Sequence, residues 1–245
     1  SSGIGCRIAA RSISTYRNSS VLEAKYGLPQ EVKFCERCCI SNQRPCSVVE
    51  FLNVADVPKP TIHFDAEGVC DACRVAEAKA TTDWAERERE LNELCNRFRS
   101  PDSAYDCVVP GSGGKDSFYA AHVLKYRYGM HPLLVTWAPN IFTPVGWRNL
   151  ERWQKIAAHL LVNPNREVHR LLTRLALDNL FHPFQPFTIG QKALPPRLAA
   201  DMHIPLVVYG ESEAEYGNPR ASISSALREQ SYFVQHPEKI ALAGV

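Results

Sequence analysis

Apolar positions between residues 83 and 209 first follow helical spacing and then form short continuous runs separated by amphipathic segments. Asp83–Arg99 places its apolar residues three and four positions apart, and Asp83 can cap the first helical turn. The apolar runs that follow are short and continuous, which is typical of strands covered by helices on both faces. The expected strands are Asp106–Pro110, Pro132–Trp137, His159–Val162 and Pro205–Tyr209, and the expected helices are Asp116–Tyr128, Gly146–Ala157, Arg166–Leu180 and Pro196–Met202.

This alternation of strand and helix predicts an α/β fold with a doubly wound parallel sheet and right-handed crossovers. Two further regions precede it. Residues 1–33 form a polar leader, to which we assign no function, and residues 34–80 are rich in cysteine and interrupted by proline. We therefore expect three parts: the leader 1–33, the cysteine-rich segment 34–80 and an α/β domain over 83–245.

Composition narrows the class of protein. The chain has 245 residues, of which 45% are apolar and 22% charged, as expected of a globular protein. A net charge of +2 argues against a general binder of nucleic acid or of membrane surfaces. No run approaches the roughly 20 apolar residues that span a bilayer. All nine cysteines lie within the first 107 residues and no secretory signal is visible, so we expect a cytoplasmic protein with reduced thiols.

Two Cys-x-x-Cys pairs indicate a metal site. Cys35 with Cys38 and Cys70 with Cys73 can supply four thiolates to one tetrahedral Zn²⁺, which would also provide folding energy for a short segment. Alternatives stay open: an iron–sulfur cluster, a redox pair or free buried thiols. The rival ligands are Cys39, which could replace Cys38, and Cys46, whereas Cys95 and Cys107 are expected in the core.

The segment Ser112-Gly113-Gly114-Lys115-Asp116-Ser117 lies between an expected strand and an expected helix. Its glycines allow successive N–H groups to face one anion, the helix directs its positive end there, and Lys115 adds a charge. Asp116 fits either a Mg²⁺ ligand or a cap that locks the turn. A Walker loop would need glycine where Val109 stands, and a G-x-G-x-x-G loop would need it at position 116. A plain surface turn is the less favoured interpretation.

These six residues resemble the SGG-x-DS loop of the PP-loop ATP pyrophosphatase superfamily. The resemblance implies that ATP is cleaved at its α-phosphorus, with Lys115 and Asp116 catalytic and Ser112–Ser117 holding the phosphates. It also implies that Gly210 and Glu211 face this loop across a crevice and that Thr136 lies beside the adenosine. From the residues alone, Glu211 is equally well a solvated loop acid, and Trp137 is better explained by core packing.

A closer resemblance rests on further motifs. They are Phe34-Cys35-x-x-Cys38, Phe64-Asp65-x-Glu67-Gly68-Val69-Cys70-x-x-Cys73-Arg74, Gly146-x-Arg148-Asn149-Leu150, Pro183-Phe184-Gln185-Pro186-Phe187 and Tyr209-Gly210-Glu211 with Glu215-Tyr216-Gly217. Residues 34–217 resemble the N-acetyl sugar amidotransferase family of bacterial surface-polysaccharide and nonulosonic-acid pathways. This implies an enzyme that uses ATP, Mg²⁺ and ammonia to convert the acetamido group of a sugar into an acetamidino group. Compared with the family, residues 46–60 are an insertion and the chain is C-terminally short.

Two other functions remain as alternatives: a PP-loop enzyme that modifies tRNA, and a zinc module that binds nucleotide without catalysis. Thiolases of the first kind need a reactive cysteine beyond the loop, and none follows Cys107. A glutaminase likewise needs a nucleophilic cysteine at an elbow or at the N-terminus, where Ser1 stands. We therefore expect a separate glutaminase partner that delivers ammonia.

Overall fold

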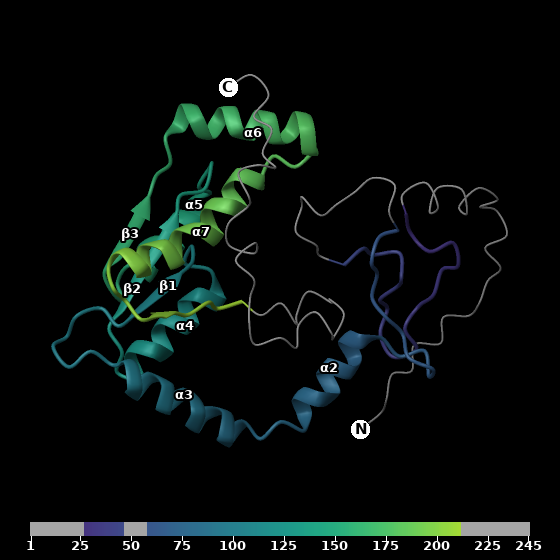
Figure 1. The fold of residues 1–245 in the computed structure, drawn as a ribbon, viewed down its shortest axis with the longest axis horizontal. Helices are drawn as coiled ribbons and strands as arrows, with labels where there is room; N and C mark the ends of the chain where they lie inside the picture. The colour runs from purple at the N-terminus through teal and green to yellow at the C-terminus, as the bar shows by residue number, and fades with distance from the viewer. Residues whose placement is uncertain (1–26, 47–57, 212–245) are drawn as a thin grey trace. The chain divides into compact units, whose positions relative to one another are not determined.

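The computed structural model describes residues 27–46 and 58–211, which divide into two compact units (Figure 1). The first unit contains the described residues up to Lys79, and the second those from Ala80 onward. Most of the expected leader 1–33, residues 47–57 of the insertion and the part of the expected α/β domain after Glu211 lie outside the described residues. The two units are described separately below.

The first unit is built around a small buried cluster formed by Cys35, Ile62, Val69 and Cys70. Its chain forms tight turns closed by single antiparallel bridges, among them Phe34 with Ser41 and Phe64 with Cys70. One helix, α2 (Asp71–Ala80), begins directly after Cys70 and carries Cys73 in its first turn. A cluster this small gives little hydrophobic stabilisation, so the unit depends on other interactions to hold its turns.

The second unit contains a four-stranded parallel sheet. In chain order its elements are α3 (Trp84–Phe98), β1 (Cys107–Pro110), α4 (Lys115–Tyr126), β2 (Pro132–Trp137), α5 (Pro144–Trp153), β3 (His159–Val162), α6 (Arg166–Leu180), α7 (Gln185–Asp201) and β4 (Leu206–Val207). The strand order is β3-β2-β1-β4, and every pairing is parallel. The predicted parallel sheet and α/β class are confirmed, and β2, β3 and α6 have the predicted bounds.

Helices pack on both faces of the two central strands. On one face, Val109 and Leu134 contact residues of α4 and α5, including the fully buried Trp153. On the other face, Val108 and Leu133 contact Ala199 of α7. The prediction of strands buried on both faces is right for β1 and β2 but too broad for β3 and β4, which lie at the edges and are only partly buried.

Helix α7 differs most from the sequence prediction. It begins at Gln185 rather than Pro196 and keeps Pro195 and Pro196 in its interior. Proline usually marks the start of a helix because it lacks an N–H, and this led to the shorter prediction. Contacts of Leu194 and Leu198 with the sheet hold the helix together across the two prolines.

The remaining differences are at element ends. Helix α5 stops at Trp153 instead of Ala157, and β4 is limited to Leu206–Val207. Helix α3 begins as predicted, with Asp83 accepting the N–H of Glu86. In its apolar stripe only Cys95 is buried.

No helix within residues 27–46 and 58–211 is long and apolar enough to cross a membrane.

Candidate metal centre and phosphate loop

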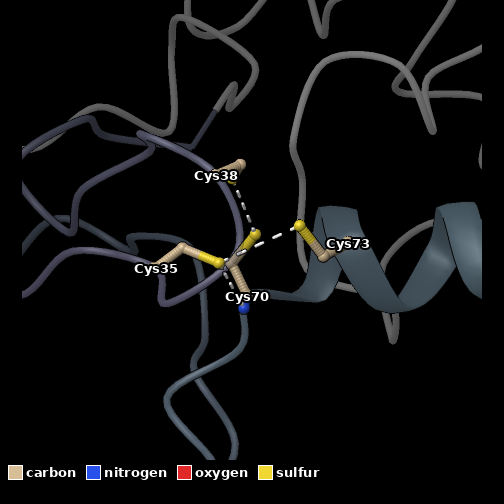
Figure 2. Close-up of side chains that lie close together, drawn as sticks. All are labelled: Cys35, Cys38, Cys70 and Cys73. Carbon is tan, nitrogen blue, oxygen red and sulfur yellow. Dashed lines mark hydrogen bonds between the residues drawn. The ribbon is translucent and has the colours of Figure 1, made fainter. Parts of the chain in front are cut away.

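The four cysteines of the two Cys-x-x-Cys pairs come together in the first unit (Figure 2). All four sulfur atoms lie within 4.8 Å of one another. The Sγ atoms of Cys35 and Cys73 are 3.9 Å apart, and those of Cys38 and Cys70 are 3.7 Å apart. Cys39 and Cys46, the rival ligands, lie outside this cluster, so the structure selects Cys38 over Cys39.

These separations suit a single tetrahedral metal ion such as zinc. A Zn–S bond of about 2.3 Å places the sulfurs of a regular tetrahedron about 3.8 Å apart. An iron–sulfur cluster would need wider spacing between some of the four sulfurs, because its cysteines are divided among two or more irons. Backbone N–H groups of Arg37 and Cys70 donate to the sulfur of Cys35 at 3.4 and 3.3 Å, as expected for a thiolate held in a tight turn.

The protonation of the cysteines follows from these contacts. Burial acts to raise the pKa of Cys35, but N–H groups of Cys70, Arg37 and Cys38 stabilise its thiolate and lower the pKa to about 6. Burial and the neighbouring sulfurs raise the pKa of Cys73 to about 12. Without a cation the four sulfurs therefore resist becoming thiolates together, and a divalent metal would supply the charge that they need.

Turns around the cysteines are fixed by hydrogen bonds. One carboxylate oxygen of Asp65 accepts a hydrogen bond from the Val69 N–H at 3.0 Å. The other carboxylate oxygen accepts a hydrogen bond from Nε of Arg74 at 2.6 Å. The arginine side chain lowers the pKa of Asp65. Gly68 has a φ of +73°, and a Cβ there would lie 2.9 Å from the Glu36 side chain, which explains the glycine before the second cysteine pair.

In the second unit, the predicted phosphate loop joins the end of β1 to the start of α4. Gly113 has a φ of +79°, and a Cβ there would lie only 2.8 Å from the carbonyl oxygen of Asn149 in α5. Gly114 is the N-cap of α4 and, having no side chain, provides no side-chain cap. The positive end of the helix dipole lies at this turn and favours an anion there.

The charged residues of the loop point to solvent. The Lys115 side chain is 87% exposed, and its Nζ donates to Asp116 at 2.6 Å. Asp116 is thus an ion-pair partner and not the cap that was one of its two expected roles. Ser117 is buried instead and its hydroxyl donates to the Gly114 carbonyl at 3.3 Å, across the first turn.

Gly210 lies against the same helical turn. A Cβ on this residue would be 2.6 Å from the carbonyl carbon of Asp116, so the segment after β4 touches the start of α4. Glu211 follows directly and is exposed. In the sheet β1 lies between β2 and β4, and the chain reaches β4 only after β3, the strand at the opposite edge.

Thr136 and Trp137, at the end of β2, are placed differently from each other. Thr136 is 2% exposed and its hydroxyl donates to the Gly111 carbonyl at 2.5 Å, just before the loop. The Trp137 ring packs directly against Gly190 of α7, in agreement with a packing role. Cys95 and Cys107 are buried at 1% and 0% exposure, as predicted for core residues.

Nothing in the sequence indicates that His159 and Gln154 lie near Thr136. His159 lies within hydrogen-bonding distance of both Thr136 and Gln154. A histidine at the start of an apolar run carries no local signal of such a role, because its partners lie on other elements.

No protein-family model matches the chain. The chain is similar to an uncharacterized protein of Methanocaldococcus jannaschii, with 27% identity over 77 residues. These residues are 31% of this chain and 27% of that relative, so the likeness covers about a quarter of the relative's length.

Alanine substitutions at the two adjacent loop glycines show whether a loss of stability comes from backbone strain or only from the added methyl group. Gly113→Ala should destabilise the second unit by about 2 kcal/mol, because alanine resists positive φ and its methyl group meets the Asn149 carbonyl. Gly114→Ala is the matched control, since a Cβ there meets only the Ser112 hydroxyl at 4.0 Å and φ is −66°. Urea unfolding followed by fluorescence would measure both. Equal stability of the two variants would contradict this description of the loop.

Proposed function

We propose that the protein is an ATP-dependent amidotransferase that adenylates the acetamido group of an N-acetyl sugar and replaces its oxygen with ammonia. The observation that carries the proposal is the arrangement of β1, the Ser112–Ser117 loop and the start of α4, with Gly210 against the same turn. The proposal includes the doubly wound fold of the PP-loop ATP pyrophosphatases for the second unit.

The loop has the properties of a binding site for a polyphosphate. The N-cap of α4 is a glycine that offers no capping side chain, and the helix dipole favours a negative charge at this end. The exposed side chain of Lys115 can turn from Asp116 to a phosphate oxygen, because both lie at the surface. Glycine at 113 brings the backbone close to the anion without a side chain between them.

Two carboxylates are available for the Mg²⁺ that accompanies ATP. Asp116 belongs to the first turn of α4, and Glu211 follows the glycine that touches this turn. Oxygen ligands of this kind suit Mg²⁺, which would neutralise phosphate charge when bound. In this assignment Lys115 and Asp116 are the catalytic residues, and Thr136 supports the loop from β2.

The chemistry follows from the weakness of an amide oxygen as a leaving group. The acetamido oxygen attacks the α-phosphorus of ATP, pyrophosphate leaves, and the sugar carries an adenylated imidate. Ammonia then adds to the imidate carbon, AMP departs with the former amide oxygen, and a proton is lost to give the acetamidino group. Lys115 and the loop N–H groups would stabilise the charge that develops on the departing pyrophosphate.

The ammonia is proposed to come from a separate glutaminase. Four cysteines form the metal cluster, and Cys95 and Cys107 are buried in the second unit. Burial raises the pKa of both Cys95 and Cys107, which opposes a nucleophilic role. The metal centre is proposed to be structural, holding the turns of the first unit. In keeping with the resemblance, the pathway is the cytoplasmic stage of bacterial surface-polysaccharide synthesis.

The proposal predicts AMP formation that depends on an N-acetyl sugar. The chain is incubated with ATP, Mg²⁺, an ammonium salt and a panel of N-acetyl sugar nucleotides, and AMP and sugar mass are followed together. One sugar should lose about 1 Da as its oxygen is exchanged for NH, in proportion to AMP. AMP formation driven by tRNA would favour the tRNA-modifying alternative, and ATP binding without turnover would favour the non-catalytic module.

A further inference from the structure

A chain of hydrogen bonds connects β3 to Gly111, the residue just before the phosphate loop. The Gly111 carbonyl accepts from Thr136 Oγ1 at 2.5 Å, and Thr136 Oγ1 lies 2.8 Å from His159 Nε2. His159 Nδ1 is in turn 3.1 Å from the side-chain amide nitrogen of Gln154, the C-cap of α5. Three segments that are distant in sequence, around Gly111, Thr136 and residues 154–159, are thus joined.

The chemistry of these groups fixes the direction of each bond. A carbonyl only accepts, so the single hydrogen of the Thr136 hydroxyl points to Gly111. The same hydroxyl must then accept from His159, which places the ring hydrogen on Nε2 and leaves Nδ1 as an acceptor for the Gln154 amide. Burial lowers the pKa of His159, which favours this neutral ring.

The tether adds to other contacts at this turn, where the Gly111 N–H donates to the Val135 carbonyl at 3.0 Å. Position 111 needs glycine, because a Cβ there would lie 2.3 Å from the Ser117 side chain. The Gly111–Ser112 peptide is trans, so its carbonyl and its N–H point in opposite directions. Holding the carbonyl toward Thr136 therefore turns the Ser112 N–H away from Thr136.

The far end of the loop is held in a similar way. The Gly114 carbonyl accepts the Ser117 hydroxyl at 3.3 Å and the Phe118 N–H at 2.9 Å. This orients the Gly114–Lys115 peptide and the Lys115 N–H. The carbonyls of Gly111 and Gly114, which precede and follow the next two residues of the turn, are thus both held by the protein's own donors.

We infer that Thr136 and His159 are positioning residues that hold the Ser112 N–H ready for a phosphate oxygen of the bound polyphosphate. This rests on the proposed function, since it assigns the loop to a polyphosphate. His159 contributes through Thr136 by fixing its hydroxyl hydrogen, and the Trp153 ring, at a centroid distance of 5.5 Å, packs beside the imidazole. Neither residue takes part in the chemical step.

The affinity for inorganic pyrophosphate tests the inference by calorimetry on the full chain. Thr136→Val keeps the size of the side chain but loses the donor, so the dissociation constant should rise by on the order of tenfold. Thr136→Ser, the matched control, keeps the hydroxyl and should stay within about twofold of the parent chain. Equal affinity of the valine variant and the parent chain would overturn the inference and leave the proposed function standing.

A second measurement needs no substitution and no ligand. Long-range ¹H–¹⁵N NMR of the parent chain should show the His159 ring hydrogen on Nε2 and a bare Nδ1. A ring hydrogen on Nδ1 alone would overturn the inference, because Thr136 would then be free to turn its hydrogen toward His159. Absence of pyrophosphate binding by the parent chain would overturn both the inference and the proposed function.

Discussion

Lys115→Ala should lower kcat/KM for ATP by on the order of 100- to 1,000-fold in the sugar-dependent release of pyrophosphate. Lys115 supplies the one full positive charge of the Ser112–Ser117 loop, and its long exposed side chain can follow the phosphates as charge moves onto pyrophosphate. The loss should fall on kcat more than on KM, because the charge is larger in the transition state than in bound ATP.

Lys155→Ala provides the matched control for this substitution. Lys155 is also exposed and lies after the end of α5, outside the loop. Its replacement should leave the rate within about twofold, as expected of a surface change away from the site. Thermal unfolding of both variants should match that of the parent chain. A Lys115→Ala enzyme with full activity would contradict the assignment of the loop to catalysis.

Cys70→Ser should abolish stoichiometric metal binding and unfold the first unit. Cys70 is fully buried, and its sulfur lies 3.7 Å from that of Cys38 within the cluster. The small cluster of the first unit cannot hold its turns without the metal, so loss of one ligand should remove most of the folding energy. The expected result is about one zinc per chain in the parent protein and none in the variant, by elemental analysis.

Limited proteolysis of the Cys70→Ser chain then shows which unit has unfolded. Trypsin should cut the Cys70→Ser chain within residues 34–80 and leave the second unit intact, since the units have separate cores. Cys39→Ser is the matched control, because Cys39 is exposed and lies outside the cluster. It should keep the zinc and the resistance to trypsin. Zinc content unchanged in the Cys70→Ser protein would exclude the four-cysteine site.

The sequence was sufficient to identify the central strands and the four cysteines of the candidate metal site. Val108, Val109, Leu133 and Leu134 form continuous apolar runs, and such runs are buried on both faces when helices flank them. The Cys-x-x-Cys spacing places two sulfurs on one tight turn, so the pairs themselves are predictable. Whether Cys38 or Cys39 completes the first pair depends on the turn geometry, which sequence alone does not give.

Features that depend on tertiary packing could not be predicted. The two interior prolines of α7 suggest a helix start, and only the contacts of Leu194 and Leu198 with the sheet keep the longer helix. The position of β4 beside β1 is likewise set by packing, since an apolar run at Leu206 fits either edge of the sheet. The contact of Gly210 with the start of α4 follows from that choice.

Polar contacts between residues distant in sequence are even harder to predict from the sequence. Thr136 was expected beside adenosine, by resemblance, whereas its hydroxyl is engaged with Gly111 and His159. A threonine at the end of an apolar strand looks the same in either role.

The fate of the acetamido oxygen tests the central claim most directly. The sugar nucleotide that supports AMP formation is prepared with ¹⁸O in its acetamido group and incubated with the protein, ATP, Mg²⁺ and ammonium. If the amide oxygen attacks the α-phosphorus, the ¹⁸O should appear in AMP, with one labelled atom for each acetamidino group formed. Unlabelled AMP, or ¹⁸O in inorganic phosphate together with ADP, would contradict the account.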